Sequence, residues 1–130
     1  MARTILLVDD SSAVRETVSE VLGAEGYRVL EAENGRQALE LLRKGPEPGL
    51  ILLDLMMPVM DGWQFLKERA TSAALSEIPV IVLSATADDE LLAGTCAFLQ
   101  KPMRLEVLLE ALDRYYRLPD DAGKRIDSRR

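Results

Sequence analysis

The chain has 130 residues, 48% of them hydrophobic, which is enough to bury the core of one ordinary domain. Acidic residues outnumber basic ones by 22 to 16, and this balance argues against nucleic-acid binding, because phosphate backbones are bound by basic surfaces. Histidine is absent, which excludes histidine-based catalytic triads, imidazole metal ligands and phosphohistidine carried by this chain.

Five short runs of apolar or mixed residues predict β-strands. The run at residues 5–8 is continuously apolar, as in a strand covered on both faces, and is too short for a signal peptide or a membrane span. The run at residues 27–32 is mixed, which indicates a position near an edge of the sheet. Cys96 is the one cysteine, so we interpret it as a core residue and expect a soluble, cytoplasmic protein. The predicted strands are residues 5–8, 27–32, 50–53, 79–83 and 97–100.

Segments of helical period separate these runs. Ser11 or Ser12 provides an N-cap for the first helix, and Asp61 provides one for the third. The last helix spans about residues 104–116, where leucines recur on one face. The segment at residues 86–96 leaves room for about two helical turns, so we expect the fourth helix to be short or irregular.

Strands that alternate with helices at this spacing predict a doubly wound α/β fold. We expect a five-stranded parallel sheet with helices on both faces. In open sheets of this kind, chemistry occurs outside the carboxyl ends of the strands. We assign residues 1–118 to this domain, and we expect the polar residues 119–130 to be a disordered tail or a linker.

Polar side chains follow four of the predicted strands at these carboxyl ends. Asp9 and Asp10 follow the first strand, Asp54 follows the third, Ser84 the fourth and Lys101 the fifth. Each of these residues alone has an ordinary explanation, such as a helix cap, a turn or a solvated charge. Their joint occurrence at one edge of the sheet favours a functional site instead.

This combination of side chains points to phosphoryl chemistry supported by magnesium. Carboxylates packed together repel one another unless a cation compensates their charge. Mg²⁺ prefers such oxygen ligands and keeps open positions for phosphoryl oxygens. A carboxylate can attack phosphorus to give an aspartyl phosphate, and a lysine can spread the charge that develops during transfer.

At these residues the chain resembles the receiver domains of two-component response regulators, from Thr4 to about Tyr116. The motif that follows the third strand, D-L-M-M-P-V-M-D-G, is the most specific part of this resemblance. The resemblance implies the flavodoxin-like strand order 2-1-3-4-5, which the chemotaxis regulator of this family has. The matching motifs are residues 5–10, residues 54–62, Ser84-Ala85 and Lys101-Pro102.

The resemblance also implies how the acidic residues act. Asp54 would be the phosphoacceptor and also a metal ligand. Asp10 would bind Mg²⁺ directly, and Asp9 would bind it mainly through water. The backbone carbonyl of Met56 would complete the set of protein ligands.

Three further residues would respond to the phosphoryl group. Lys101 would pair with it, and the bond between Lys101 and Pro102 is expected to be cis. Ser84 would be the switch hydroxyl, and Phe98 occupies the switch aromatic position, for which plain core packing is the alternative. A sensor histidine kinase or phosphotransfer protein would donate the group. An unknown downstream protein would then read a surface made by the fourth helix, the fifth strand and the fifth helix.

Two other functions remain open from the sequence. A pseudo-receiver would bind partners without accepting phosphate, and a Mg²⁺-dependent phosphohydrolase would use an aspartate nucleophile. Such a hydrolase usually has a second acid two residues after its nucleophile, and here that position is Met56. Because a methionine cannot orient water, we expect a phosphoacceptor with self-phosphorylation and slow autophosphatase activity rather than a conventional enzyme.

Overall fold

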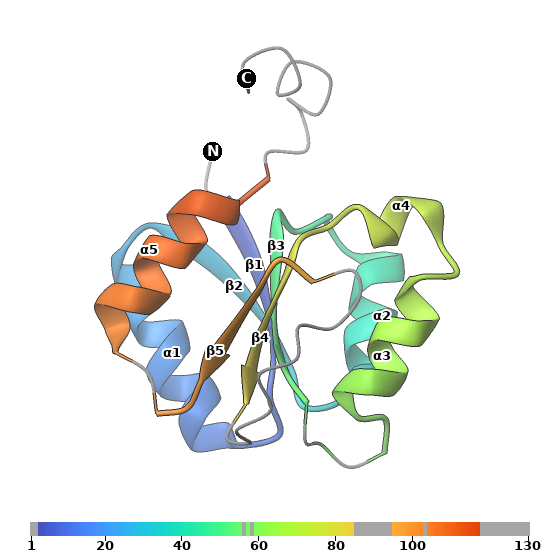
Figure 1. The fold of residues 1–130 in the computed structure, drawn as a ribbon, viewed down its shortest axis with the longest axis horizontal. Coiled ribbons are helices and arrows are strands. Elements are labelled where there is room, and N and C mark those ends of the chain that lie inside the picture. The colour runs from blue at the N-terminus through green and yellow to red at the C-terminus, as the bar shows by residue number, and fades with distance from the viewer. Residues whose placement is uncertain (1–2, 56, 58, 85–94, 103, 118–130) are drawn as a thin grey trace.

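A computed structural model describes the chain over residues 3–55, 57, 59–84, 95–102 and 104–117. Five parallel strands form one sheet in the order β2-β1-β3-β4-β5, which confirms the predicted doubly wound fold and its strand order (Figure 1). The strands are β1 (Arg3–Val8), β2 (Tyr27–Ala32), β3 (Leu50–Asp54), β4 (Val80–Ser84) and β5 (Ala97–Gln100).

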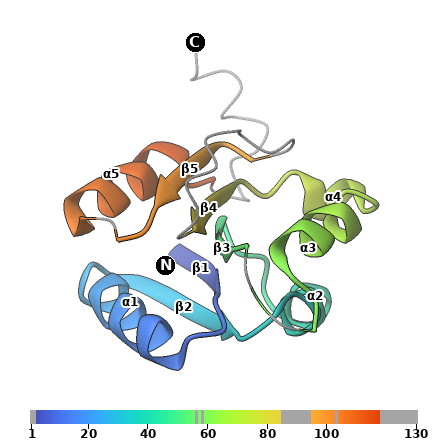
Figure 2. The same ribbon diagram turned by 60° about the horizontal axis from the view of Figure 1, so that its bottom comes forward.

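Helices cover both faces of the sheet. The helices are α1 (Ser12–Ala24), α2 (Gly35–Lys44), α3 (Gly62–Arg69), α4 (Ala73–Ser76) and α5 (Leu105–Tyr115). α1 and α5 lie on one face, and α2, α3 and α4 lie on the other (Figures 1 and 2). Within the described residues, no helix is both long and apolar enough to cross a membrane.

The short helix α4 is not predicted by the sequence pattern. Its four residues are too few to show a helical period, although Ser72 caps it by accepting a hydrogen bond from the amide of Leu75. It precedes β4 and therefore differs from the fourth helix predicted at residues 86–96. Most of that predicted helix lies outside the described residues.

The composition of each strand explains its place in the sheet. Every residue of β3 and β4 is buried, as expected for central strands covered on both faces. β2 and β5 lie at the two edges and contain partly exposed residues, which confirms the edge position predicted for residues 27–32. β4 ends at Ser84, one residue later than predicted.

The core consists of two hydrophobic layers, one on each face of the sheet. Successive strand residues point to opposite faces, so Leu6 belongs to one layer, while Ile5 and Leu7 belong to the other. The layer beneath α2 and α3 includes Leu39, Leu42, Phe65 and Leu66, and the layer beneath α1 and α5 includes Val18, Leu22, Leu108 and Leu112.

Hydrogen-bonded caps fix where the helices near the carboxyl edge begin. Ser11, one of the two predicted caps, accepts a hydrogen bond from the amide of Val14 at 3.2 Å. Asp61, also predicted as an N-cap, forms a capping box with Gln64 at the start of α3. The helices that follow β1 and β3 therefore begin at fixed positions beside the predicted site.

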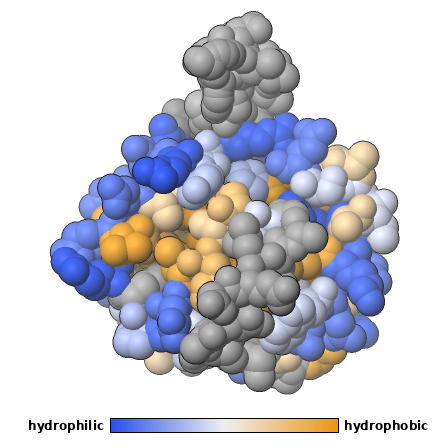
Figure 3. Space-filling model, in the orientation of Figure 1, coloured by the Kyte–Doolittle hydropathy of each residue, from blue (hydrophilic) through white to orange (hydrophobic). Residues whose placement is uncertain are grey.

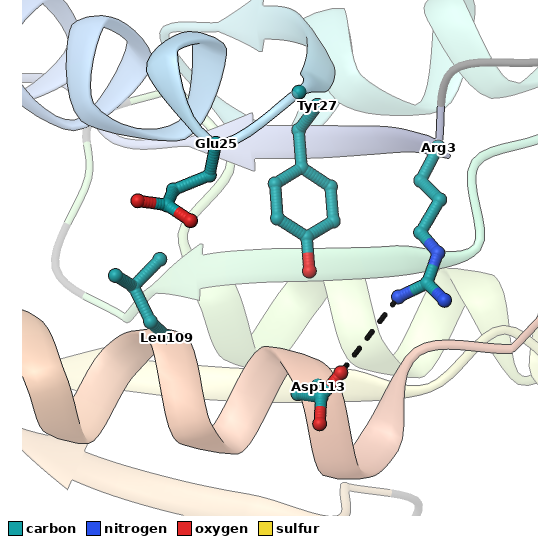
Figure 4. A pocket seen from close by; sticks show the side chains of 6 residues that line it. Arg3, Glu25, Tyr27, Leu109 and Asp113 are labelled. Carbon is teal, nitrogen blue, oxygen red and sulfur yellow. Dashed lines mark ion pairs between the residues drawn. The ribbon is translucent and has the colours of Figure 1, made fainter.

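At the opposite end of the sheet, the side chain of Tyr116 packs against the start of β1. Its hydroxyl accepts a hydrogen bond from the amide of Thr4 at 2.7 Å, and burial raises its pKa. A cavity of about 470 Å³ lies beside it, lined by Tyr27 and by an ion pair of Arg3 and Asp113 at 4.0 Å (Figure 4). Because this cavity adjoins the starts of β1 and β2, it lies away from the predicted site.

Candidate functional site

Three predicted carboxylates meet at the carboxyl edge of the sheet. Asp9 follows β1, and Asp54 ends the neighbouring strand β3. Asp9 and Asp54 are buried, while Asp10 is exposed. Each offers a carboxylate oxygen that lies within 4.8 Å of the other two. The structure therefore brings together acids that belong to two separate strand ends.

Asp9 is fixed on several sides. Its main-chain carbonyl accepts a hydrogen bond from Arg15 at 2.7 Å. Its Oδ1 accepts one from the amide of Ser11 at 2.9 Å, and its Oδ2 accepts one from Lys101 Nζ at 2.7 Å. Because both carboxylate oxygens of Asp9 already have protein donors, the exposed Asp10 is better suited to bind a cation directly.

Lys101 brings the positive charge of the site from the far edge of the sheet. Its Nζ lies 2.7 Å from Asp9 Oδ2 and 3.9 Å from Asp54 Oδ1. Its amide donates to the carbonyl of Ser84 at 2.8 Å, which fixes the start of the loop after β5. The peptide bond between Lys101 and Pro102 is cis, as predicted.

The two predicted switch residues lie on β4 and β5. Ser84 is fully buried at the end of β4, one position after Leu83, which pairs with Asp54. Phe98 is half-buried on β5 and packs against the core layer beneath α2 and α3. These positions are compatible with the switch roles that the resemblance implies, and both roles stay predictions.

Three predicted features lie outside the described residues. One is Met56, whose carbonyl is the predicted third metal ligand. Another is most of the segment at residues 86–96, which would contribute to the predicted output surface. The third is the tail predicted at residues 119–130.

The carboxylate oxygens of the acidic cluster are suitable ligands for a hard divalent cation. Three carboxylates against one ammonium leave an excess of negative charge in a partly buried space. Such an excess is unfavourable unless a cation compensates it. All three acidic groups offer oxygen, which suits Mg²⁺ better than metals that prefer sulfur or imidazole ligands.

The loop after Asp54 contains a strained residue. Val59 has a φ of 69°, in the left-handed region that β-branched residues rarely adopt, and it is 69% exposed. We expect Val59→Asn to stabilise the protein by roughly 1 kcal/mol, because asparagine tolerates this conformation and little packing is lost. Urea unfolding of the two proteins measures the difference, and equal midpoints would contradict the expectation.

Arg15 is the site neighbour that the sequence pattern does not reveal. It lies near the N-terminus of α1, where a cation opposes the helix dipole. This unfavourable placement is a signal that its side chain has a specific partner. Its side chain binds the carbonyl of Asp9 and the carboxylate of Glu31.

Cys96 and Arg69 are polar groups whose hydrogen bonds serve the fold and not the acidic cluster. The thiol of the half-buried Cys96 donates to the carbonyl of Val80 at 3.4 Å, and burial raises its pKa, which agrees with a core residue. The guanidinium of Arg69 donates to the carbonyls of Ser76 and Ile78, and burial lowers its pKa. Both groups lie on elements other than those that carry the acidic cluster.

Comparison with known proteins agrees with the fold and identifies a family. Residues 5–113 match the response regulator receiver domain family. The chain is 41% identical over 81 residues to the two-component response regulator ORR5 of Oryza sativa subsp. japonica. That match covers 62% of this chain and 60% of the relative, so the chain spans less than two thirds of the relative's length.

Solved structures give the same result. The signal receiver domain of a signal transduction histidine kinase from Syntrophus aciditrophicus is 33% identical with a TM-score of 0.81, covering 88% of this chain and 89% of that one. The receiver domain of the sensor histidine kinase PA1611 from Pseudomonas aeruginosa is 29% identical with a TM-score of 0.82, covering 88% and 98%. The latter has a magnesium ion coordinated in its active site cleft. With this fold and this family match, the chain belongs to the response regulator receiver domain family of two-component systems.

Proposed function

We propose that this chain accepts a phosphoryl group on Asp54 with Mg²⁺ bound, and that this modification switches a partner-binding surface. The observation that carries the proposal is the cluster in which Lys101 Nζ lies 2.7 Å from Asp9 Oδ2 and 3.9 Å from Asp54 Oδ1. Membership of the receiver family and the magnesium ion in the PA1611 receiver domain support it.

The acidic cluster would hold the metal. Asp10 and Asp54 would bind it directly, the Met56 carbonyl would complete the protein ligands, and Asp9 would bind mainly through water. The hydrogen bonds that Asp9 already accepts from Ser11 and Lys101 support this division of roles. When bound, Mg²⁺ would supply charge compensation for the oxygens of the transferred group.

Asp54 would be the nucleophile. One of its carboxylate oxygens would attack the phosphorus of a phosphohistidine on a sensor histidine kinase or phosphotransfer protein. An O–P bond forms as the N–P bond breaks, and the donor imidazole keeps the electron pair and takes up a proton. Lys101 would shift from Asp9 towards the phosphoryl oxygens and spread the charge that develops there.

Water would later attack the phosphorus and restore the Asp54 carboxylate. By resemblance, the Met56 side chain would lie beside the path of this water, and a methionine side chain cannot orient water. We therefore expect slow autophosphatase activity. On this view the protein is a self-phosphorylating phosphoacceptor rather than a conventional enzyme.

The signal would reach a partner through β5 and α5. Ser84 would move towards a phosphoryl oxygen, and Phe98 would turn inward. Hydrophobic side chains gather on the surface over these elements (Figure 3), and a groove of about 220 Å³ there is lined by Leu99, Val107 and Tyr115 among others. An unknown downstream protein would bind this surface differently before and after phosphorylation.

The proposal also includes the extent and setting of the domain. Residues 1–118 would form the receiver domain, and residues 119–130 would be a tail or a linker. The protein would work in the cytoplasm, and this domain would contact neither nucleic acid nor a membrane.

Intact mass spectrometry after incubation with Mg²⁺ and acetyl phosphate tests the proposal. We expect the wild-type protein to gain one phosphoryl group, and we expect Asp54→Asn and metal-chelated protein to gain none. Asp113→Asn, which alters an exposed acid on α5, is the matched control and should be labelled like the wild type. An unlabelled wild type would favour a pseudo-receiver, and turnover of many small phosphate esters would favour a phosphohydrolase.

A further inference from the structure

Arg15 joins three elements at the carboxyl edge of the sheet. Its guanidinium donates to the main-chain carbonyl of Asp9 at 2.7 Å, just after β1. It also donates to Glu31 on β2 at 3.3 Å, and Glu31 accepts a further hydrogen bond from Ser19 on α1 at 2.9 Å. The Arg15 side chain is only 17% exposed, so this arrangement is held within the protein.

The carbonyl that Arg15 binds has a particular position in the site. It belongs to the peptide group that links Asp9 to Asp10. Because a peptide group is planar, fixing the direction of its carbonyl also fixes the direction of the Asp10 N–Cα bond, and so the position of the Cα that carries the Asp10 side chain. Asp10 is exposed, so this constraint comes through its backbone and not through packing of its side chain.

We propose that Arg15 is a positioning residue for the acidic pair. By holding the Asp9–Asp10 peptide, it presents the Asp10 carboxylate to the metal in the orientation needed for binding. Glu31 orients the guanidinium for this contact. This inference rests on the proposed binding of Mg²⁺ by the acidic cluster, and it adds a residue that the resemblance does not include.

Arg15 affects the affinity for Mg²⁺ in two opposite ways. Its positive charge repels Mg²⁺, so removing that charge alone would strengthen binding. Its hydrogen bond to Asp9 orders the ligands, so removing the bond would weaken binding, and residues that orient metal ligands typically contribute about 10- to 100-fold in affinity. The ion pair with Glu31 offsets much of the repulsion, so we expect the positioning effect to dominate.

Titration calorimetry of the full chain with Mg²⁺, without any phosphodonor, measures this balance. We expect Arg15→Met to weaken Mg²⁺ binding by about tenfold. The double variant Arg15→Met with Glu31→Gln removes the hydrogen bond while the summed charge of the pair stays neutral, and it should show at least the same loss. Arg36→Met removes an exposed cation from α2 without touching Asp9, and it should bind Mg²⁺ at least as tightly as the wild type.

The results separate this inference from the proposed function. A wild type that binds no Mg²⁺ would refute the metal site and the role of Arg15 with it. Wild-type binding that Arg15→Met retains or strengthens would overturn the role of Arg15 alone. Urea unfolding of the metal-free proteins identifies a merely structural role, which would lower stability and leave the Mg²⁺ affinity unchanged.

If Arg15→Met does not fold, Arg15→Lys serves instead, because lysine keeps the charge and loses the planar fork of the guanidinium. Arg15→Lys should also bind Mg²⁺ more weakly than the wild type.

Discussion

Lys101→Met is expected to slow phosphorylation of Asp54 by about 100- to 1,000-fold, the size of effect seen when one donor to a developing charge is removed. The ammonium lies 2.7 Å from Asp9 Oδ2 and 3.9 Å from Asp54 Oδ1, within reach of oxygens on a group attached to Asp54. Methionine keeps an unbranched side chain of similar length but carries no charge. The expected loss therefore comes from charge and not from packing.

The same substitution should affect Mg²⁺ in the opposite direction. Removing the ammonium increases the negative charge of the acidic cluster, so Mg²⁺ should bind as tightly as before or more tightly. A time course of labelling with acetyl phosphate and a calorimetric Mg²⁺ titration together show both effects. Lys67→Met, which alters an exposed lysine on α3, is the matched control and should change neither. Wild-type labelling of Lys101→Met would contradict the role of Lys101.

The sequence predicts the sheet well because the central strands are mainly apolar, while the edge strand β2 is mixed. β1, β3 and β4 each contain a continuous run of four apolar residues, as expected for strands covered on both faces. The mixed run of β2 correctly predicts an edge. α4 could not be predicted in the same way, because one helical turn shows no period.

The sequence predicts which residues reach the site, but it does not predict their pairing. Lys101 and the acids lie at or just after the carboxyl ends of strands in one parallel sheet, so they share an edge whatever the register. β5 is separated from β1 by β3 and β4, yet Lys101 forms its shorter ion pair with Asp9, which follows β1. The length of the lysine side chain and the direction of the loop after β5 decide this, and neither is visible as a pattern.

The contact of Arg15 with Asp9 cannot be predicted from the sequence for a related reason. A hydrogen bond from a side chain to a main-chain carbonyl leaves no complementary residue type in the sequence. The acceptor is present at every position, so only the fold shows which one is used.

Gly62→Ala is expected to destabilise the protein by roughly 2–3 kcal/mol, because it overpacks a contact between backbones. A Cβ at Gly62 would lie 2.7 Å from Leu55 Cα and 2.9 Å from the carbonyl oxygen of Asp54. The amide of Gly62 also donates to the carbonyl of Leu55 at 2.9 Å, so α3 begins directly against the end of β3. Backbone atoms cannot turn aside as a side chain can, so α3 must move away from the strand that carries Asp54.

This displacement should reduce phosphorylation as well as stability. Asp54 lies in the backbone that the new methyl group would push, and a site built from several elements loses rate when one of them is misplaced. Urea unfolding and the labelling time course measure the two effects. Gly23→Ala is the matched control, since a Cβ at Gly23 meets no atom within 4 Å, and alanine in α1 should stabilise by up to about 1 kcal/mol without changing labelling. Equal unfolding midpoints for Gly62→Ala and the wild type would show that α3 adapts without moving β3, and would contradict the prediction.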